Sequence, residues 1–280
     1  MTLSKFKSYF LPTLVLVLFA VSYYPALANF VTKWSGSDDY THSFFIVPVI
    51  VYMIWLKREA LVTHTGSSLV GFMLVILSIL LYLVSLQLQV PTFIFLATVA
   101  SIISALIYIG GFRVLKELAI PILLLFMIIP IPNQLFSMLT GSLQLNISAV
   151  SEIFVRQFSV PIFREGNVLH IQDMSFQVVE ACSGIRSLIS MTTLSILIGY
   201  FTLTRMWSIS LLFLFSIPAA IVINIIRVIT LVLTFHYLKI DLSVGTSHTI
   251  MGLVLFILGL ILLFAFQRVL ESWETKKKNN

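Results

Sequence analysis

Apolar residues along this chain gather in long runs, which charged and turn-forming residues separate. A helix needs about 20 mainly apolar residues to cross the hydrocarbon core of a bilayer. The pattern therefore predicts an all-α integral membrane protein with about eight transmembrane helices. The eight candidate runs lie at about residues 9–28, 43–56, 68–86, 92–111, 117–131, 183–203, 207–235 and 248–267.

The second and fifth runs are the least regular of the eight. Run 43–56 is short and contains Pro48, and run 117–131 contains Pro121 and Pro130. Proline removes a backbone donor and bends a helix. We therefore expect both helices to be kinked or tilted.

The longest stretch without a predicted span covers residues 132–182. From Leu135 to Phe158, polar residues interrupt the apolar ones at a spacing that fits an amphipathic helix lying in the membrane interface. Residues 162–180 combine turn formers with apolar and polar residues in alternation, which predicts a short β-hairpin. We expect residues 1–280 to form a single polytopic membrane domain, with 132–182 as an extracytoplasmic insertion.

Composition and charge agree with a membrane protein. Hydrophobic residues make up 59% of the chain and charged residues 10%, whereas soluble domains have about 45–50% and about 25%. This composition excludes a soluble enzyme. The net charge of +6 would suggest nucleic acid as a partner of a soluble protein, but basic residues of a membrane protein mark its cytoplasmic loops. We therefore expect membrane lipid and no nucleic acid as a partner.

The basic residues also predict the orientation. With a cytoplasmic N-terminus and eight spans, eleven of the seventeen lysines and arginines lie on the inner side. This asymmetry predicts a multi-pass protein of the cytoplasmic (inner) membrane with both termini in the cytoplasm. The eleven inner residues are Lys5, Lys7, Lys57, Arg58, Arg113, Lys116, Arg205, Arg268, Lys276, Lys277 and Lys278.

The chain has one cysteine, Cys182, which cannot form a disulfide within the chain. It is an inert buried thiol, a link between two copies, or a reactive nucleophile. Cys182 lies in the segment Glu180-Ala181-Cys182-Ser183-Gly184-Ile185-Arg186, where the sixth span begins. A helix N-terminus and a nearby Arg186 both stabilise a thiolate. The alternative is a small residue packed beside Gly184, with Arg186 reaching lipid headgroups.

Two further polar residues lie inside or beside apolar runs. Arg227 follows Trp207 by 20 residues, about 30 Å along a helix, which predicts a position in the outer leaflet. An arginine there is costly unless it faces a partner or a wet cavity, although it could also reach outward to headgroups. Asn224 shares its helix face. His248 begins the eighth span at the same expected depth.

A thiol, a guanidinium and an imidazole at one depth suit acyl transfer. The imidazole of His248 can take the proton of the Cys182 thiol and return it to a leaving amine, and the guanidinium of Arg227 can stabilise an oxyanion. We expect Arg186, Asn224 and Glu180 to support this site or bind substrate. No metal-ligand spacing or phosphate-binding loop occurs, so no metal or cofactor is expected.

A set of short motifs follows in a fixed order along the chain. They are Tyr40-Thr41-His42-Ser43, Ile129-Pro130-Ile131-Pro132, Arg164-Glu165-Gly166-Asn167, Glu180-Ala181-Cys182-Ser183-Gly184-Ile185-Arg186-Ser187-Leu188, Pro218-Ala219-Ala220, Asn224-Ile225-Ile226-Arg227 and Ser247-His248. Together they resemble the exosortase/archaeosortase family of integral-membrane transpeptidases, over about residues 38–267.

This resemblance implies a multi-span cysteine transpeptidase or protease with an extracytoplasmic site. Such an enzyme processes sorting signals at the C-termini of exported proteins, which consist of a short motif such as Pro-Glu-Pro, a transmembrane helix and a basic tail. By motif match, Cys182 resembles the nucleophile, Arg227 the catalytic arginine and His248 the third member of the site, as in bacterial exosortases.

Two other classes of function remain compatible with the residues. A membrane transporter or exopolysaccharide-export subunit would also place Arg227 and Asn224 inside a span, because ionisable residues line transport paths. It would not need the thiol of Cys182. A structural scaffold without chemistry would need Arg227 only for folding.

Overall fold

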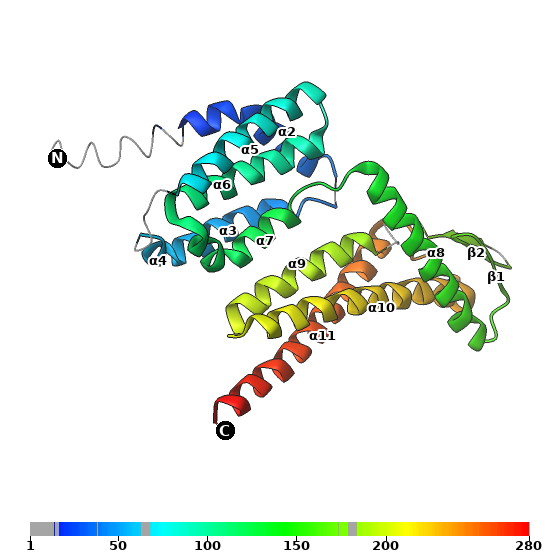
Figure 1. Ribbon diagram of the computed structural model, residues 1–280. Coiled ribbons are helices and arrows are strands. Elements are labelled where there is room, and N and C mark those ends of the chain that lie inside the picture. Colours follow the sequence, from blue (N-terminus) through cyan, green and yellow to red (C-terminus); the bar gives the residue numbers. More distant parts are fainter. Residues whose placement is uncertain are drawn as a thin grey trace. The chain divides into compact units, whose positions relative to one another are not determined.

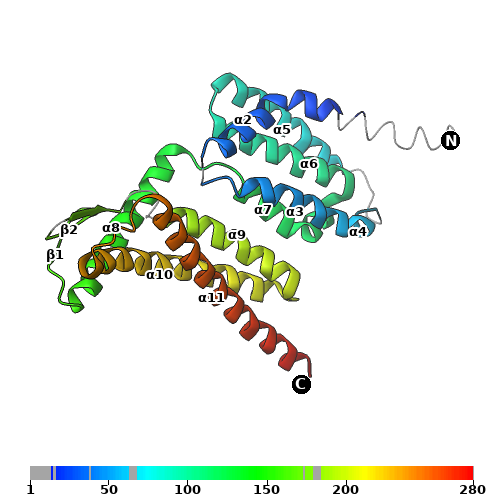
Figure 2. The same ribbon diagram turned by 180° about the vertical axis from the view of Figure 1, so that it is seen from behind.

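The computed structural model describes residues 14, 17–37, 39–62, 68–172, 174–178 and 184–279. The chain divides into two units, Met1–Ile131 and Pro132–Asn280, each with its own set of packed helices (Figures 1 and 2). The boundary falls where the sequence predicts the insertion 132–182 to begin.

The described part of the first unit is helical. α5 and α6 lie side by side as an antiparallel hairpin, α2 contacts α6, and α3 contacts α7 (Figures 1 and 2). The helices are α2 (Tyr24–Ser35), α3 (Ser43–Leu56), α4 (Arg58–Val62), α5 (Leu69–Leu88), α6 (Pro91–Glu117) and α7 (Ala119–Met127).

Small residues allow α5 and α6 to approach closely. A Cβ atom at Gly71 would lie 2.5 Å from the Cα atom of Tyr108, so only glycine fits there. Further along, the hydroxyls of Ser78 and Ser104 lie 3.0 Å apart and share a hydrogen bond. Small side chains and interhelical hydroxyl bonds are the usual means of joining helices in a membrane.

Among the described residues, five helices are long and apolar enough to cross a membrane. They are α5, α6, α9 (Ile185–Thr202), α10 (Met206–Leu238) and α11 (Gly245–Asn279). These helices match the predicted spans at 68–86, 92–111, 183–203, 207–235 and 248–267.

The prediction of eight spans is not confirmed. Predicted span 43–56 is α3, a helix of 14 residues, and predicted span 117–131 shrinks to the nine residues of α7. At about 1.5 Å per residue, α7 covers about 14 Å, roughly half of the hydrocarbon core. The first predicted span, 9–28, lies partly outside the described residues.

In the second unit, α10 is the central helix and contacts α8 (Asn133–Gln157), α9 and α11. Helix α8 confirms the predicted helix at 135–158, and it is not among the candidate spans. Its interfacial, extracytoplasmic position stays a prediction. One cluster of buried residues joins α8, the sheet, α10 and α11 in an apolar core; it includes Ile147, Leu169, Phe176, Val232 and Met251.

The predicted β-hairpin is present, and a third strand extends it. The antiparallel strands are β1 (Ile162–Glu165), β2 (Val168–Ile171) and β3 (Met174–Gln177), in the order β1-β2-β3. Gly166 has φ +60° at the first position of the two-residue turn between β1 and β2, as type II′ hairpins require. The third strand forms because Phe176 and Val178 turn toward the apolar core.

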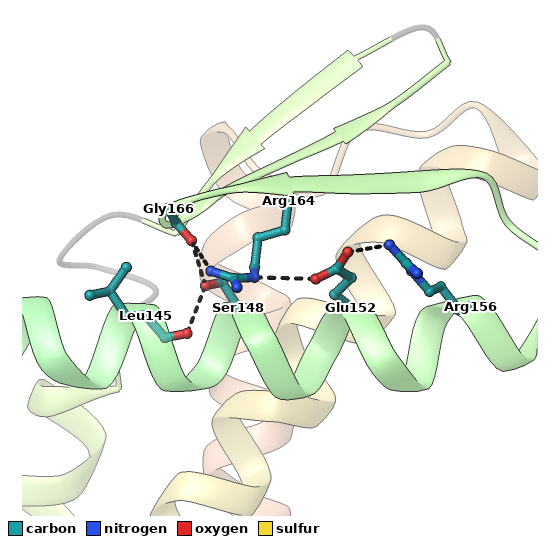
Figure 3. Close-up of polar contacts among 6 residues, drawn as sticks. All are labelled: Leu145, Ser148, Glu152, Arg156, Arg164 and Gly166. Atoms are coloured by element: carbon teal, nitrogen blue, oxygen red, sulfur yellow. Dashed lines mark hydrogen bonds and ion pairs between the residues drawn. The ribbon is translucent and has the colours of Figure 1, made fainter.

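A polar network attaches the sheet to α8 (Figure 3). The carboxylate of Glu152 accepts hydrogen bonds from Arg156 at 2.6 Å and from Arg164 of β1 at 3.2 Å. Arg164 also donates to the carbonyl oxygen of Gly166, and so does the hydroxyl of Ser148. The turn between β1 and β2 is therefore fixed to the helix beneath it.

Asn167, next in the same turn, links that turn to the end of β3. Its side-chain amide donates to Gln144 of α8 at 3.1 Å and to the carbonyl oxygen of Val178 at 3.0 Å. The amide N–H of Val178 donates to the carbonyl oxygen of Asn167 at 2.9 Å. These bonds hold the chain at Val178, the last described residue before 184.

The far end of α11 is bound to the turn between α9 and α10. The carboxylate of the buried residue Glu274 accepts hydrogen bonds from the backbone N–H and the hydroxyl of Thr204, at 2.9 and 2.7 Å. It also accepts one from the backbone N–H of Arg205 at 3.1 Å. Glu274 thus satisfies backbone donors at the start of α10 that the helix itself leaves without a partner.

Candidate active site

A pocket of about 350 Å³ lies among α9, α10 and α11. Its polar lining includes Arg186 near the start of α9, Asn224 and Arg227 from α10, and His248 from the start of α11. Because α10 runs opposite to its two neighbours, these positions meet near one end of three candidate spans. Four residues singled out in the sequence, from three helices, therefore line one pocket.

Arg227 and His248 are in direct contact. The distance from Nη2 of Arg227 to Nε2 of His248 is 2.7 Å. A guanidinium has only donors, so the arginine donates and the imidazole nitrogen accepts. The neutral ring then carries its proton on Nδ1, which is buried.

Asn224 is buried in α10, with 2% of its surface exposed. It lies against Gly184, where an added Cβ atom would come within 2.8 Å of the Asn224 Cγ atom. Gly184 also has φ +78°, a conformation that residues with side chains rarely adopt. Glycine is therefore required at this position for two independent reasons.

Gly252 lies one turn after His248 on the same face of α11. A Cβ atom there would lie 3.2 Å from Nη2 and 3.6 Å from Cζ of Arg227. Because Gly252 has no side chain, the guanidinium of Arg227 has room to lie against α11 at this position. No role was predicted for Gly252 from the sequence, although its spacing of four residues from His248 is a readable signal.

The other two predicted site residues, Cys182 and Glu180, lie outside the described residues. Gly184 follows Cys182 by two positions in the sequence and lines the pocket. Arg186, two residues further on, is exposed at the same pocket.

The pocket has an apolar part beside its polar one. The rest of the lining includes Ile223 of α10, Leu253, Leu255 and Phe256 of α11, and the small residues Ser187 and Ser190 of α9. A ligand with a polar group next to an apolar one fits such a lining. Sequence reasoning missed this apolar part, because single apolar residues do not stand out within apolar runs.

Two of the sequence motifs meet within the first unit. The hydroxyl of Tyr40 accepts a hydrogen bond from the backbone N–H of Ile131 at 2.9 Å. Nearby in the chain, the indole N–H of Trp34 donates to the carbonyl oxygen of Ile128 at 3.1 Å. Burial lowers the pKa of His42, just before α3, below its usual value. Trp34 and Tyr40 thus tie the chain before α3 to residues 128–131.

Within the described part of the chain, no group of three or more histidine, cysteine, aspartate or glutamate residues is arranged to hold a metal ion. The polar groups of the pocket are the guanidinium groups of Arg186 and Arg227, the amide of Asn224, the imidazole of His248 and several hydroxyls. Such groups donate hydrogen bonds, stabilise negative charge and orient a reacting carbonyl.

Comparison with known protein families gives a match over most of the chain. A family model described as "Transmembrane exosortase" matches residues 34–265. The matched range runs through both units and includes every residue of the pocket. No curated protein and no solved structure gives a significant match.

Proposed function

The chain belongs to the transmembrane exosortase family, and from this membership and the pocket we propose that it is a membrane-embedded cysteine transpeptidase or protease. Its substrates are exported proteins with a C-terminal sorting signal of the PEP-CTERM type: a short motif, a transmembrane helix and a basic tail. The site acts on the outer face of the cytoplasmic membrane, and both termini lie in the cytoplasm.

The contact between Arg227 and His248 is the main structural support for this proposal. It brings a permanent cation and an imidazole together, in a pocket at the end of three candidate spans. An arginine within an apolar helix is costly unless it has a specific partner. Here a partner exists, and the pocket begins at Gly184, directly after the segment that contains the only cysteine.

The reaction we propose is acyl transfer through Cys182. The thiolate attacks the carbonyl carbon of the scissile peptide bond and forms a carbon–sulfur bond, and the oxygen becomes an oxyanion that Arg227 stabilises. The carbon–nitrogen bond then breaks, and the C-terminal part of the substrate leaves as an amine that takes up the proton released by the Cys182 thiol. An acceptor amine or water releases the remaining thioester.

The pocket lining supports a substrate with this architecture. Its polar groups suit the backbone around the scissile bond, and its apolar part suits the first residues of a transmembrane helix. A peptide bond directly before an apolar helix would reach both parts at once.

A transporter or exopolysaccharide-export subunit is the alternative function. Burial of Asn224 within α10 favours it, because polar residues inside a span also line transport paths. This alternative requires no thiol chemistry, so the cysteine separates the two functions.

The first test is co-expression with an exported substrate that bears the three-part tail. Cys182→Ala should abolish the shift of the substrate to its processed form on an immunoblot. Ser137→Ala, which removes a hydroxyl group from the exposed part of α8, is the control and should process normally. Normal processing by Cys182→Ala at normal abundance would exclude the cysteine mechanism and leave the transporter.

A further inference from the structure

The hydrogen bond between Arg227 and His248 restricts what the imidazole can do. Nη2 of Arg227 donates to Nε2 of His248 at 2.7 Å, because a guanidinium has no acceptor and is not deprotonated in proteins. The lone pair of Nε2 is therefore engaged, and Nδ1 carries the ring proton. Neither ring nitrogen can accept a proton from a thiol while this bond exists.

A charged imidazole does not fit this arrangement either. Protonation at Nε2 would put two positive groups against each other at hydrogen-bond distance and break the contact. A general base at position 248 would thus have to release Arg227 before each proton transfer. The sequence-based expectation of proton transfer does not account for the observed contact.

Gly252 indicates that α11 is shaped around the guanidinium. The same nitrogen, Nη2, lies 3.2 Å from the place where a Cβ atom of Gly252 would be. His248 and Gly252 are four residues apart on one helix face. One turn of α11 therefore supplies both an acceptor for the guanidinium and the free space beside it.

We infer that His248 is a positioning residue, whose Nε2 atom holds the guanidinium of Arg227 in the pocket. The inference rests on the proposed function for what the guanidinium then does, which is to donate to the developing oxyanion. An oxyanion donor acts only from a fixed place, and losing one costs about 10²–10³ in rate. A displacement of about 1 Å can cost about 10²-fold.

Side-chain amides distinguish positioning from proton transfer. In His248→Gln the amide oxygen can occupy the place of Nε2 and accept the bond from Arg227. In His248→Asn the oxygen reaches only the place of Nδ1, and His248→Ala has no acceptor. None of the three side chains can carry a proton as imidazole does.

We expect His248→Gln to process substrate within about tenfold of the wild-type rate, and His248→Asn and His248→Ala to be slower by about 10²–10³. The measurement is the rate of substrate processing at matched abundance. If His248→Gln is as slow as His248→Ala while all variants are produced normally, positioning is wrong and proton transfer stands. This result is distinct from failure of the proposed function, which normal processing by Cys182→Ala would reveal.

A second measurement needs no active variant. In the wild-type protein labelled with ¹⁵N-histidine, the His248 signal, assigned by its loss in His248→Gln, should report a neutral ring with its proton on Nδ1 at neutral pH. In Arg227→Ala this preference should weaken. A proton on Nε2 in the wild-type protein would overturn the inference, whatever the variants do.

Discussion

At the scale of single residues, the space beside Arg227 depends on the missing side chain of Gly252. A methyl group there would lie 3.2 Å from Nη2, so the guanidinium would have to move by a few tenths of an ångström. We expect Gly252→Ala to slow processing by about tenfold and Gly252→Leu by about 10²-fold or more, because the donor is displaced. The measurement is the processing rate at matched abundance.

Gly141 is the matched control for this change. It also lies in a helix, α8, but nothing lies within 4 Å of the place where its Cβ atom would be. Gly141→Ala should leave processing unchanged and raise stability by up to about 1 kcal/mol, since glycine is a poor helix former. Wild-type rates in Gly252→Leu would mean that the guanidinium position is unimportant for processing.

The meeting of Asn224, Arg227 and His248 was predictable, because the order of the spans puts all three at one depth. The atom-level contact was not. Sequence spacing says which residues share a helix face, but not that Nε2 of His248 is the acceptor, since this depends on how α10 and α11 are rotated against each other. Glycines such as Gly252 are visible in a sequence, yet what they make room for is not.

At the scale of helices, Glu274 joins the end of α11 to the start of α10. Its carboxylate accepts hydrogen bonds from three donors. In Glu274→Gln the side-chain amide has only one acceptor oxygen, and its NH₂ group would face the N–H and O–H donors of Thr204 and Arg205. Hydrogen bonds to charged groups contribute about 1.5–3 kcal/mol each, so we expect a loss of about 2 kcal/mol or more. Thermal unfolding in detergent measures it.

Glu271, one turn earlier on α11, is the control for Glu274. Its side chain is 43% exposed and lies 3.5 Å from Arg268, and exposed ion pairs contribute about 1 kcal/mol or less. It also accepts a hydrogen bond from Gln267 at 3.0 Å, which the amide oxygen of a glutamine can accept as well. Glu271→Gln should therefore change the melting temperature little. Equal effects of the two substitutions would show that Glu274 is no more than another surface charge.

Predicted span 117–131 is much shorter in the structure for a physical reason. Hydropathy detects apolar runs, but it does not detect where the backbone leaves the helix. In the first unit, Gly111 has φ +66° inside α6, and Leu118 separates α6 from the short α7. Apolar residues continue through these breaks, so the sequence alone predicted a complete span where the structure has a nine-residue helix.

At the scale of the whole molecule, the three candidate spans of the second unit relate the pocket to the C-terminus. If α9, α10 and α11 each cross the membrane once, the start of α9 and the end of α11 lie on opposite sides. This parity holds however many times the first unit crosses. A pocket on the outer face therefore requires a cytoplasmic C-terminus, as the basic residues also predict.

Reporter fusions test this orientation. A reporter active only in the cytoplasm should work after Lys276, and a reporter active only outside should work at the turn near Asn167. If the cytoplasmic reporter works only near Asn167 and the outer reporter only after Lys276, the orientation proposed for the protein is wrong. If the same reporter works at both sites, the two sites lie on one side of the membrane, and one of α9, α10 and α11 does not cross it.

Helix α11 carries His248 near its start and Glu274 near its end, 26 residues apart, which is about 39 Å of continuous helix. A continuous helix shifts as a unit, so a displacement along its axis by one residue would move every side chain by about 1.5 Å. The hydrogen bonds of Glu274 to Thr204 and Arg205 oppose such a displacement. Truncating the chain before residue 274 would remove this contact, so we expect it to disturb the alignment of His248 with Arg227, and affinity tags belong beyond residue 276.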